Sequence, residues 1–227
     1  MRLLAIDTST WWGGVALLEA GSGSMRLVAE TGVWVEDSHA ARVLALADAA
    51  LSVAGWRKDD LDAFAATCGP GSFTGLRVGL GALSGLALAT GRPCVGVGTL
   101  EAMAEAAGPG AFDRAPMLDA GRGEVYSARY DPGASPPREI VAPWVGEPER
   151  ALEGWGGAGV VLFGGGAAVH EARLREAGYR GPIGAAPTSV AAGAGRIALA
   201  RLAAGAAGDS PLEPLYLRPS DAEVKFR

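Results

Sequence analysis

Two aspartates, Asp7 and Asp119, each follow a predicted strand, where a carboxylate could take part in binding or catalysis. The apolar segments 3–6 and 115–118 end in Asp7 and Asp119, and each acid leads into a turn of small or polar residues and a second apolar segment. In this position two acids could face a bound nucleotide. They could also do no more than cap their own turns, since Asp side chains readily bond to the backbone two residues on.

The stretch Gly-Pro-Gly-Ser-Phe-Thr-Gly-Leu-Arg at residues 69–77 is the most distinctive in the chain. It follows an apolar segment and opens a helical pattern, where free backbone N–H groups favour an anion near Gly71 and Ser72. The Lys-Ser/Thr pair of a phosphate-binding P-loop does not follow its glycines. A glycine turn with Ser72 as the helix N-cap is therefore the favoured interpretation.

Two further glycine segments belong to the nucleotide hypothesis. Asp119-Ala-Gly121 has the Asp-x-Gly form of a phosphate loop, and Gly164 and Gly165 open a turn between a strand and a helix. Around Asp7, by contrast, Trp11 and Trp12 crowd the turn. We therefore interpret these positions as a vestigial nucleotide or anion site, without intrinsic ATPase activity. Its residues are Asp7, Gly71, Ser72, Asp119, Gly121, Gly164 and Gly165.

The metal-ligating and nucleophilic residues are few. His39 has Val43 four residues on, so the helical His pair of many metal sites is missing, and His170 is far away in sequence. Cys68 and Cys94 lack a Cys-x-x-Cys partner, and no Gly-x-Ser-x-Gly elbow occurs. The sequence therefore predicts no catalytic residue, no metal ligand and no cofactor of its own.

Composition limits the function classes. The chain has 227 residues, of which 49% are hydrophobic and 20% charged, and its net charge is −5. This argues for a packed α/β protein and against strong direct RNA binding, which needs a basic face. The opening segment is too short for a signal peptide, and the longest apolar run, 78–89, is shorter than the ~20 residues of a membrane span. We expect a soluble, cytoplasmic protein.

The elements that must position these residues repeat along the chain. Apolar periodicity predicts the order β-β-β-α-β-α-β up to about residue 97, and the strand, acid, turn and hairpin pattern then starts again at 115. This predicts a two-lobed, duplicated α/β fold of the actin, sugar-kinase and chaperone-ATPase type. We expect residues 1–106 plus 188–227 in one lobe and 107–187 in a second, inserted lobe.

Two predicted helices, 38–54 and 72–90, carry apolar stripes. On the second helix Gly75, Gly79, Ala82 and Leu86 share one face, and a leucine stripe forms another. Either both stripes belong to the core, or the leucines are left for a partner protein. The predicted partner interface comprises His39, Val43, Leu44, Leu51, Leu76, Leu80 and Leu83.

The chain resembles the TsaB family, also called YeaZ. The resemblance rests on the motifs at residues 4–10, 69–77, 122–126 and 214–218, in the family's order over nearly the whole chain. It implies a cytoplasmic, non-catalytic partner of the homologous enzyme TsaD, working with the ATPase TsaE in making threonylcarbamoyladenosine in tRNA.

The resemblance also implies a homodimer when the partner is absent, and contact with tRNA only through the complex. It leaves open ADP or ATP at an interface of the complex. The alternative is an enzyme of the same superfold: a metal-dependent transferase, a glycoprotease-like peptidase or a kinase-like ATPase.

Overall fold

The computed structural model describes residues 1–21, 23–35, 40–153, 159–188, 190–208 and 212–218. Its contacts divide the chain into two compact units, each described here by itself. Unit 1 is Met1–Ala106 with Thr188–Leu215, and unit 2 is Ala107–Pro187 with Tyr216–Arg227.

Unit 1 is built on a five-stranded sheet in the order β3-β2-β1-β4-β5. Strands β1, β2 and β3 form an antiparallel meander, while β4 and β5 run parallel to β1. The register pairs Ile6 with Val15 and with Ala66, so the end of β1 lies in the centre of the sheet. The strands are β1 (Arg2–Asp7), β2 (Trp12–Gly21), β3 (Ser24–Trp34), β4 (Ala63–Gly69) and β5 (Cys94–Gly98).

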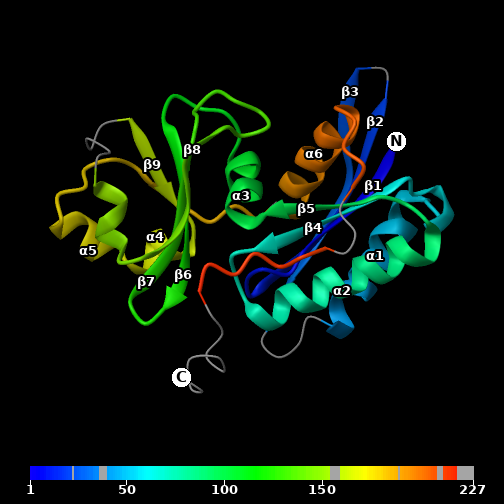
Figure 1. Ribbon diagram of the computed structural model, residues 1–227, viewed down its shortest axis with the longest axis horizontal. Helices are drawn as coiled ribbons and strands as arrows, with labels where there is room; N and C mark the ends of the chain where they lie inside the picture. The colour runs from blue at the N-terminus through cyan, green and yellow to red at the C-terminus, as the bar shows by residue number, and fades with distance from the viewer. Residues whose placement is uncertain (22, 36–39, 154–158, 189, 209–211, 219–227) are drawn as a thin grey trace. The chain divides into compact units, whose positions relative to one another are not determined.

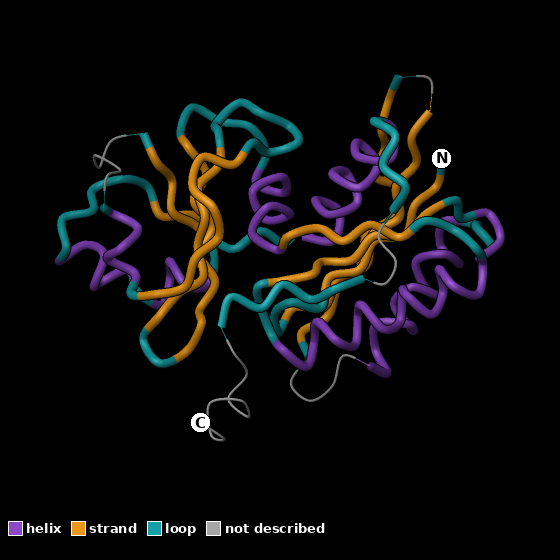
Figure 2. The backbone as a smooth tube through the Cα atoms, viewed as in Figure 1, coloured by secondary structure: helices purple, strands orange, loops and turns teal. Residues whose placement is uncertain are grey.

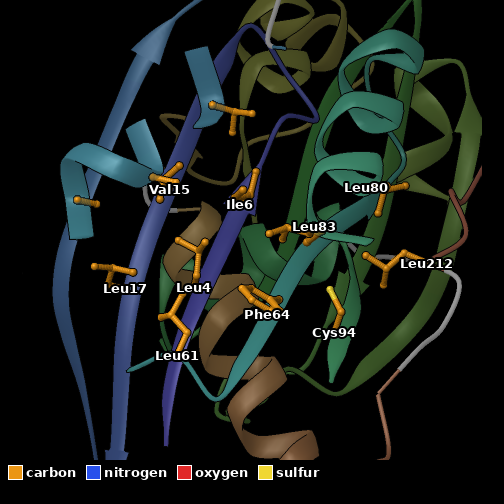
Figure 3. Close-up of a cluster of buried hydrophobic side chains, with 14 of the residues drawn as sticks. Leu4, Ile6, Val15, Leu17, Leu61, Phe64, Leu80, Leu83, Cys94 and Leu212 are labelled. Atoms are coloured by element: carbon orange, nitrogen blue, oxygen red, sulfur yellow. The ribbon is translucent and has the colours of Figure 1, made fainter. Parts of the chain in front are cut away.

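Helices cover both faces of the unit 1 sheet (Figures 1 and 2). Helices α1 (Ala40–Ala54) and α2 (Phe73–Thr90) lie on one face, and α6 (Val190–Ala203) packs against β1, β2 and β4 on the other. Helix α3 (Thr99–Ala107) follows β5, and the short 3-10 helix η1 (Lys58–Asp60) precedes β4. The core between α1, α2 and the sheet includes Leu4, Ile6, Val15, Leu17, Phe64 and Leu83 (Figure 3).

Unit 2 repeats this strand arrangement. Its sheet has the order β10-β9-β6-β7-β8, with β6, β7 and β8 antiparallel and β9 and β10 parallel to β6. The predicted duplicated α/β fold is confirmed by this match. The elements are β6 (Asp113–Gly121), β7 (Glu124–Tyr130), β8 (Glu139–Gly146), η2 (Pro148–Leu152), β9 (Val160–Phe163), α4 (Gly165–Val169), α5 (Glu171–Glu176) and β10 (Ile183–Gly184).

The end of the chain differs from the predicted division. The sequence-based division places 188–227 with the first lobe, but Tyr216–Arg227 groups with unit 2. Arg218 explains this, because its guanidinium donates to the Ala120 carbonyl at 3.0 Å and pairs with the Glu124 carboxylate. Leu215, by contrast, donates its amide to the Cys68 carbonyl of unit 1.

Candidate functional site

The side chain of Asp7, at the end of β1, forms hydrogen bonds within its own turn and to β4. Its side chain is 1% exposed, and Oδ1 accepts hydrogen bonds from the Ser9 amide at 3.0 Å, the Ser9 hydroxyl at 2.6 Å and the Thr67 hydroxyl at 2.7 Å. A carboxylate surrounded by these donors holds β1, β4 and the first turn together. This geometry corresponds to the capping interpretation of Asp7.

The Gly69–Ser72 turn is also filled by protein atoms. The Ser72 amide donates to the Ser9 carbonyl at 2.7 Å, and a Cβ on Gly71 would lie 2.3 Å from the same oxygen. The Ser72 hydroxyl accepts from the Gly75 amide at 3.2 Å, so the predicted N-cap of α2 is confirmed. The first turn of α2 therefore meets the Asp7 turn, and its amides are partly satisfied from within unit 1.

The remaining predicted nucleotide-site residues lie together in unit 2. Asp119 Oδ1 accepts from the Gly121 amide at 2.9 Å, and Gly121 starts a turn of positive φ. Gly164 and Gly165 begin α4, which approaches β6 so closely that a Cβ on Gly166 would lie 2.8 Å from the Leu118 carbonyl carbon. Within unit 2 the two glycine segments are thus neighbours, and their use by a nucleotide or anion stays a prediction.

The predicted partner-binding leucines are mostly core residues, and this part of the prediction is wrong. Leu76, Leu80 and Leu83 are 0–4% exposed and, with Val43 and Leu51, belong to the cluster between the helices and the sheet. Leu80 and Leu83 are labelled in Figure 3. Leu44 is 45% exposed, and His39 lies outside the described residues.

The glycine stripe of α2 faces inward as well. The Thr8 hydroxyl donates to the Gly75 carbonyl at 2.7 Å, and a Cβ on Gly79 would lie 2.3 Å from the Thr8 hydroxyl oxygen. Helix α2 therefore meets the first turn with its glycines and the sheet with its leucines. Both stripes named from the sequence are internal.

A third face of α2, missed by the sequence reasoning, points away from the sheet together with part of α1. Leu88 is 87% exposed and Val53 is 85% exposed, and side chains added at Gly81 or Gly85 would meet no atom within 4 Å. We call this surface the outer face. Its residues are Ala45, Ala49 and Val53 on α1 and Gly81, Gly85 and Leu88 on α2.

A small cavity opens between α1 and α2. It has a volume of about 180 Å³, with Leu4 and Phe64 of the sheet and Leu44, Leu51 and Leu86 of the helices in its wall. Asp48 and Lys58 also line it and pair at 3.2 Å. The cavity is apolar, and its volume is below the ~300 Å³ of common small-molecule sites. An apolar side chain suits it better than a cofactor does.

Helix α2 is unusually apolar along its whole length. Among the described residues, α2 is the one helix long and apolar enough to cross a membrane by length and composition alone. Its leucine and glycine stripes are nevertheless packed on the sheet and the first turn.

The described residues include no group of three or more His, Cys, Asp or Glu side chains that could hold a metal ion.

Comparisons with known proteins agree with the fold. The family model described as TsaD, tRNA N6-adenosine threonylcarbamoyltransferase, matches residues 33–168. The Escherichia coli protein named tRNA threonylcarbamoyladenosine biosynthesis protein TsaB is 37% identical over 154 residues, 67% of this chain. The match spans 62% of the E. coli protein, less than two thirds of its length.

Solved structures extend the likeness to almost the whole chain. YeaZ from Pseudomonas aeruginosa superposes with a TM-score of 0.77 at 30% identity, covering 95% of this chain and 99% of that one. Component A of Acidaminococcus fermentans (R)-2-hydroxyglutaryl-CoA dehydratase, at 15% identity, has a TM-score of 0.54 and covers 89% of this chain and 99% of its own, which shows the two-lobed fold alone. With the matching motifs and the shared fold in place, the chain belongs to the TsaB (YeaZ) family.

Proposed function

We propose that this chain is the non-catalytic partner subunit of the machinery that makes threonylcarbamoyladenosine in tRNA. Its principal partner would be a TsaD-like catalytic homologue, with a TsaE-like ATPase working alongside and tRNA bound only through the complex. The name of the E. coli relative supports the pathway, and the match to the TsaD model supports a homologous partner. The setting would be the cytoplasm.

The observation that carries the proposal is the outer face of α1 and α2. Large apolar side chains such as Leu88 and Val53 are almost fully exposed there, next to small residues. Contiguous exposed apolar surface marks protein interaction sites in soluble proteins, and we propose that these residues form one. Two helices presented side by side can pack against two helices of a homologous partner, with ridges entering grooves.

Gly81 and Gly85 give this surface its shape. Because neither has a side chain, the backbone of α2 can be approached closely along this line, and the neighbouring cavity can receive an apolar side chain from the partner. The same surface would pair with itself when the partner is absent, forming a two-fold homodimer. The predicted interface thus moves from the buried leucine stripe to the outer face.

The absence of catalysis is supported by the two closed turns of unit 1. Asp7 is held by three donors, and Gly71 abuts the Ser9 carbonyl, so neither turn offers an open carboxylate or cradle. If the chain were instead an ATP- or metal-dependent enzyme of this superfold, the purified chain alone would turn over ATP or carry about one metal ion per molecule. Measuring ATP hydrolysis and metal content of the single chain separates the two readings.

The decisive experiment introduces Gly85→Glu. A Cβ at this position would meet no atom within 4 Å, and replacing a helix-interior glycine stabilises the monomer by roughly 0.5–1 kcal/mol. In the complex, however, the carboxylate would lie between packed helices without a counterion, and binding should fall sharply. Binding to the TsaD homologue encoded by the same genome is measured by size-exclusion chromatography and calorimetry, and modified adenosine by mass spectrometry of tRNA.

Val169→Glu is the matched control. Val169 lies on α4 of unit 2 and is also exposed, so this variant adds the same charge to an exposed helix that does not belong to the outer face. We expect this variant to bind and to support tRNA modification like the parent protein. A folded Gly85→Glu protein that binds the homologue with unchanged affinity would contradict the proposed interface.

A further inference from the structure

His170 is the one buried imidazole among the described residues, and its Nε2 atom has no hydrogen-bond partner there. The residue is 8% exposed and lies between α4 and α5. Buried polar atoms in folded proteins are almost always paired, so an unpaired one asks for an explanation. The nearest acid is Asp119, whose Oδ1 lies 3.9 Å from Nε2.

The distance between Nε2 and Oδ1 is too long for a hydrogen bond, but it is within the range of an ion pair. A neutral imidazole can present Nε2 as an acceptor, and two acceptors do not bond. A protonated imidazole donates from both nitrogens, and a charge-assisted N–H···O bond to the carboxylate then becomes available. Forming it requires the two atoms to approach by about 0.7 Å, from 3.9 Å to the ~3.2 Å limit.

We propose that His170 and Asp119 form a proton-dependent clasp that controls the turn after β6. Protonation of His170 draws the Asp119 carboxylate toward α4. Asp119 Oδ1 already accepts the Gly121 amide at 2.9 Å, so a second, charged donor on the carboxylate perturbs that bond. The inference concerns unit 2 alone and does not depend on the proposed partner.

The turn is built to respond locally. Gly121, Arg122 and Gly123 all have positive φ, and for Arg122, a residue with a side chain, this conformation is uncommon. On either side the backbone is anchored, because Arg218 holds the Ala120 carbonyl and Arg173 holds the Gly123 carbonyl. The change is therefore confined to Gly121 and to Arg122, whose exposed side chain the turn presents.

The charged groups around the clasp are otherwise engaged with one another. On α5, Glu171 pairs with Arg175, and Arg173 pairs with Glu149 of η2. On β7, Glu124 pairs with Arg218. Helix α4 and strands β9 and β10 carry no charged residue. Asp119 is thus the carboxylate nearest to His170, and Arg122 is the charged residue of the turn that follows Asp119.

Nuclear magnetic resonance tests the clasp directly, because the chain has only two histidines. In a His39→Gln protein, the imidazole of His170 gives the single histidine ring signal. In a series of spectra recorded at decreasing pH, we expect this signal and the Gly121 and Arg122 amide signals to shift together, with one common midpoint. The Gly133 amide, which donates to Asp131 Oδ1 at the same 2.9 Å without a histidine beside it, is the internal control and should not follow.

Two variants complete the test. His170→Gln should abolish the pH-dependent shift of the Gly121 amide, and Asp119→Asn should reduce it by at least half while the His170 ring signal still shifts. The proposal is overturned if the His170 ring signal does not shift with pH, or if the Gly121 amide signal does not shift with it. It is also overturned if Asp119→Asn leaves the shift of the Gly121 amide unchanged. The parent measurement decides even if a variant fails to fold.

Discussion

Leu80 and Leu88 offer a test of which side of α2 faces the protein. The two leucines lie eight residues apart on one helix, yet Leu80 is 4% exposed and Leu88 is 87% exposed. Replacing each by alanine removes the same atoms from opposite environments. Helix propensity differs little between leucine and alanine, so the two variants report mainly on burial.

The expected cost follows from the exposure. Leu80→Ala removes side-chain atoms from the core of unit 1 and leaves a cavity, which lowers the free energy of unfolding by about 2–5 kcal/mol. Leu88→Ala removes atoms already in water, so stability should change by no more than about 0.5 kcal/mol. Leu80→Glu would place a carboxylate in the core and unfold the unit, so it cannot report on an interface.

Binding to the TsaD homologue should show the opposite order. If Leu88 is buried in the complex, its truncation forfeits about 1.5–3 kcal/mol, which is roughly a tenfold or greater loss of affinity. Leu80→Ala, at a temperature where it remains folded, should bind like the parent protein. Urea unfolding followed by circular dichroism gives the stabilities, and calorimetry gives the affinities.

Controls and refutation are direct. Unfolding is repeated at several protein concentrations, because self-association through the outer face would make the stability concentration-dependent. Equal destabilisation by both substitutions would refute the assignment of α2's faces. A stable Leu88→Ala protein with undiminished affinity would refute the role of Leu88 in the interface.

Three further predictions concern the fold. Gly79→Ala should destabilise unit 1, because the new Cβ would lie 2.3 Å from the Thr8 hydroxyl oxygen. Gly81→Ala should stabilise unit 1 by about 0.5–1 kcal/mol. Thermal unfolding of the two variants compares these effects. Burial raises the pKa of Tyr179, so its contribution to stability is present below the tyrosine's unfolded pKa and is lost as pH rises through its folded pKa. Tyr179→Phe should flatten this alkaline loss of stability. It should also cost about 1–3 kcal/mol at neutral pH, because it removes the single hydroxyl proton that the Val160 and Pro182 carbonyls share. Hydrogen bonds from the Gly133 amide and the Arg138 side chain lower the pKa of Asp131, so its contribution is lost as pH falls through the folded pKa, and Asp131→Asn should reduce the acid dependence of urea midpoints.

Local patterns in the sequence were sufficient for the repeated strand, acid and hairpin units. Strand periodicity and turn residues act over a few positions, and they predict β1 with β2 and β6 with β7. Ser72 as the N-cap of α2 is equally local, because its bond to Gly75 spans three residues. The element order and the duplicated fold could be predicted from such signals.

Other elements gave no clear local signal. Helix α3 and strand β8 were not predicted, and the expected helix after Gly166 is divided into α4 and α5 at His170. The end of the chain joins unit 2 through Arg218, whose partner Glu124 is 94 residues away. A bond across this sequence separation leaves no mark on the pattern around either residue.

The orientation of α2 depends on contacts between residues far apart in the sequence. Helical periodicity groups Gly75 with Gly79 and Leu76 with Leu80, but it cannot say which group meets the sheet, because both groups are small or apolar. Thr8, 67 residues before Gly75, settles the glycine side, and the strands of the unit 1 core settle the leucine side. The helical spacing of the sequence is enough to say which residues share a face. Long-range packing, which no local pattern encodes, makes Gly81, Gly85 and Leu88 face outward.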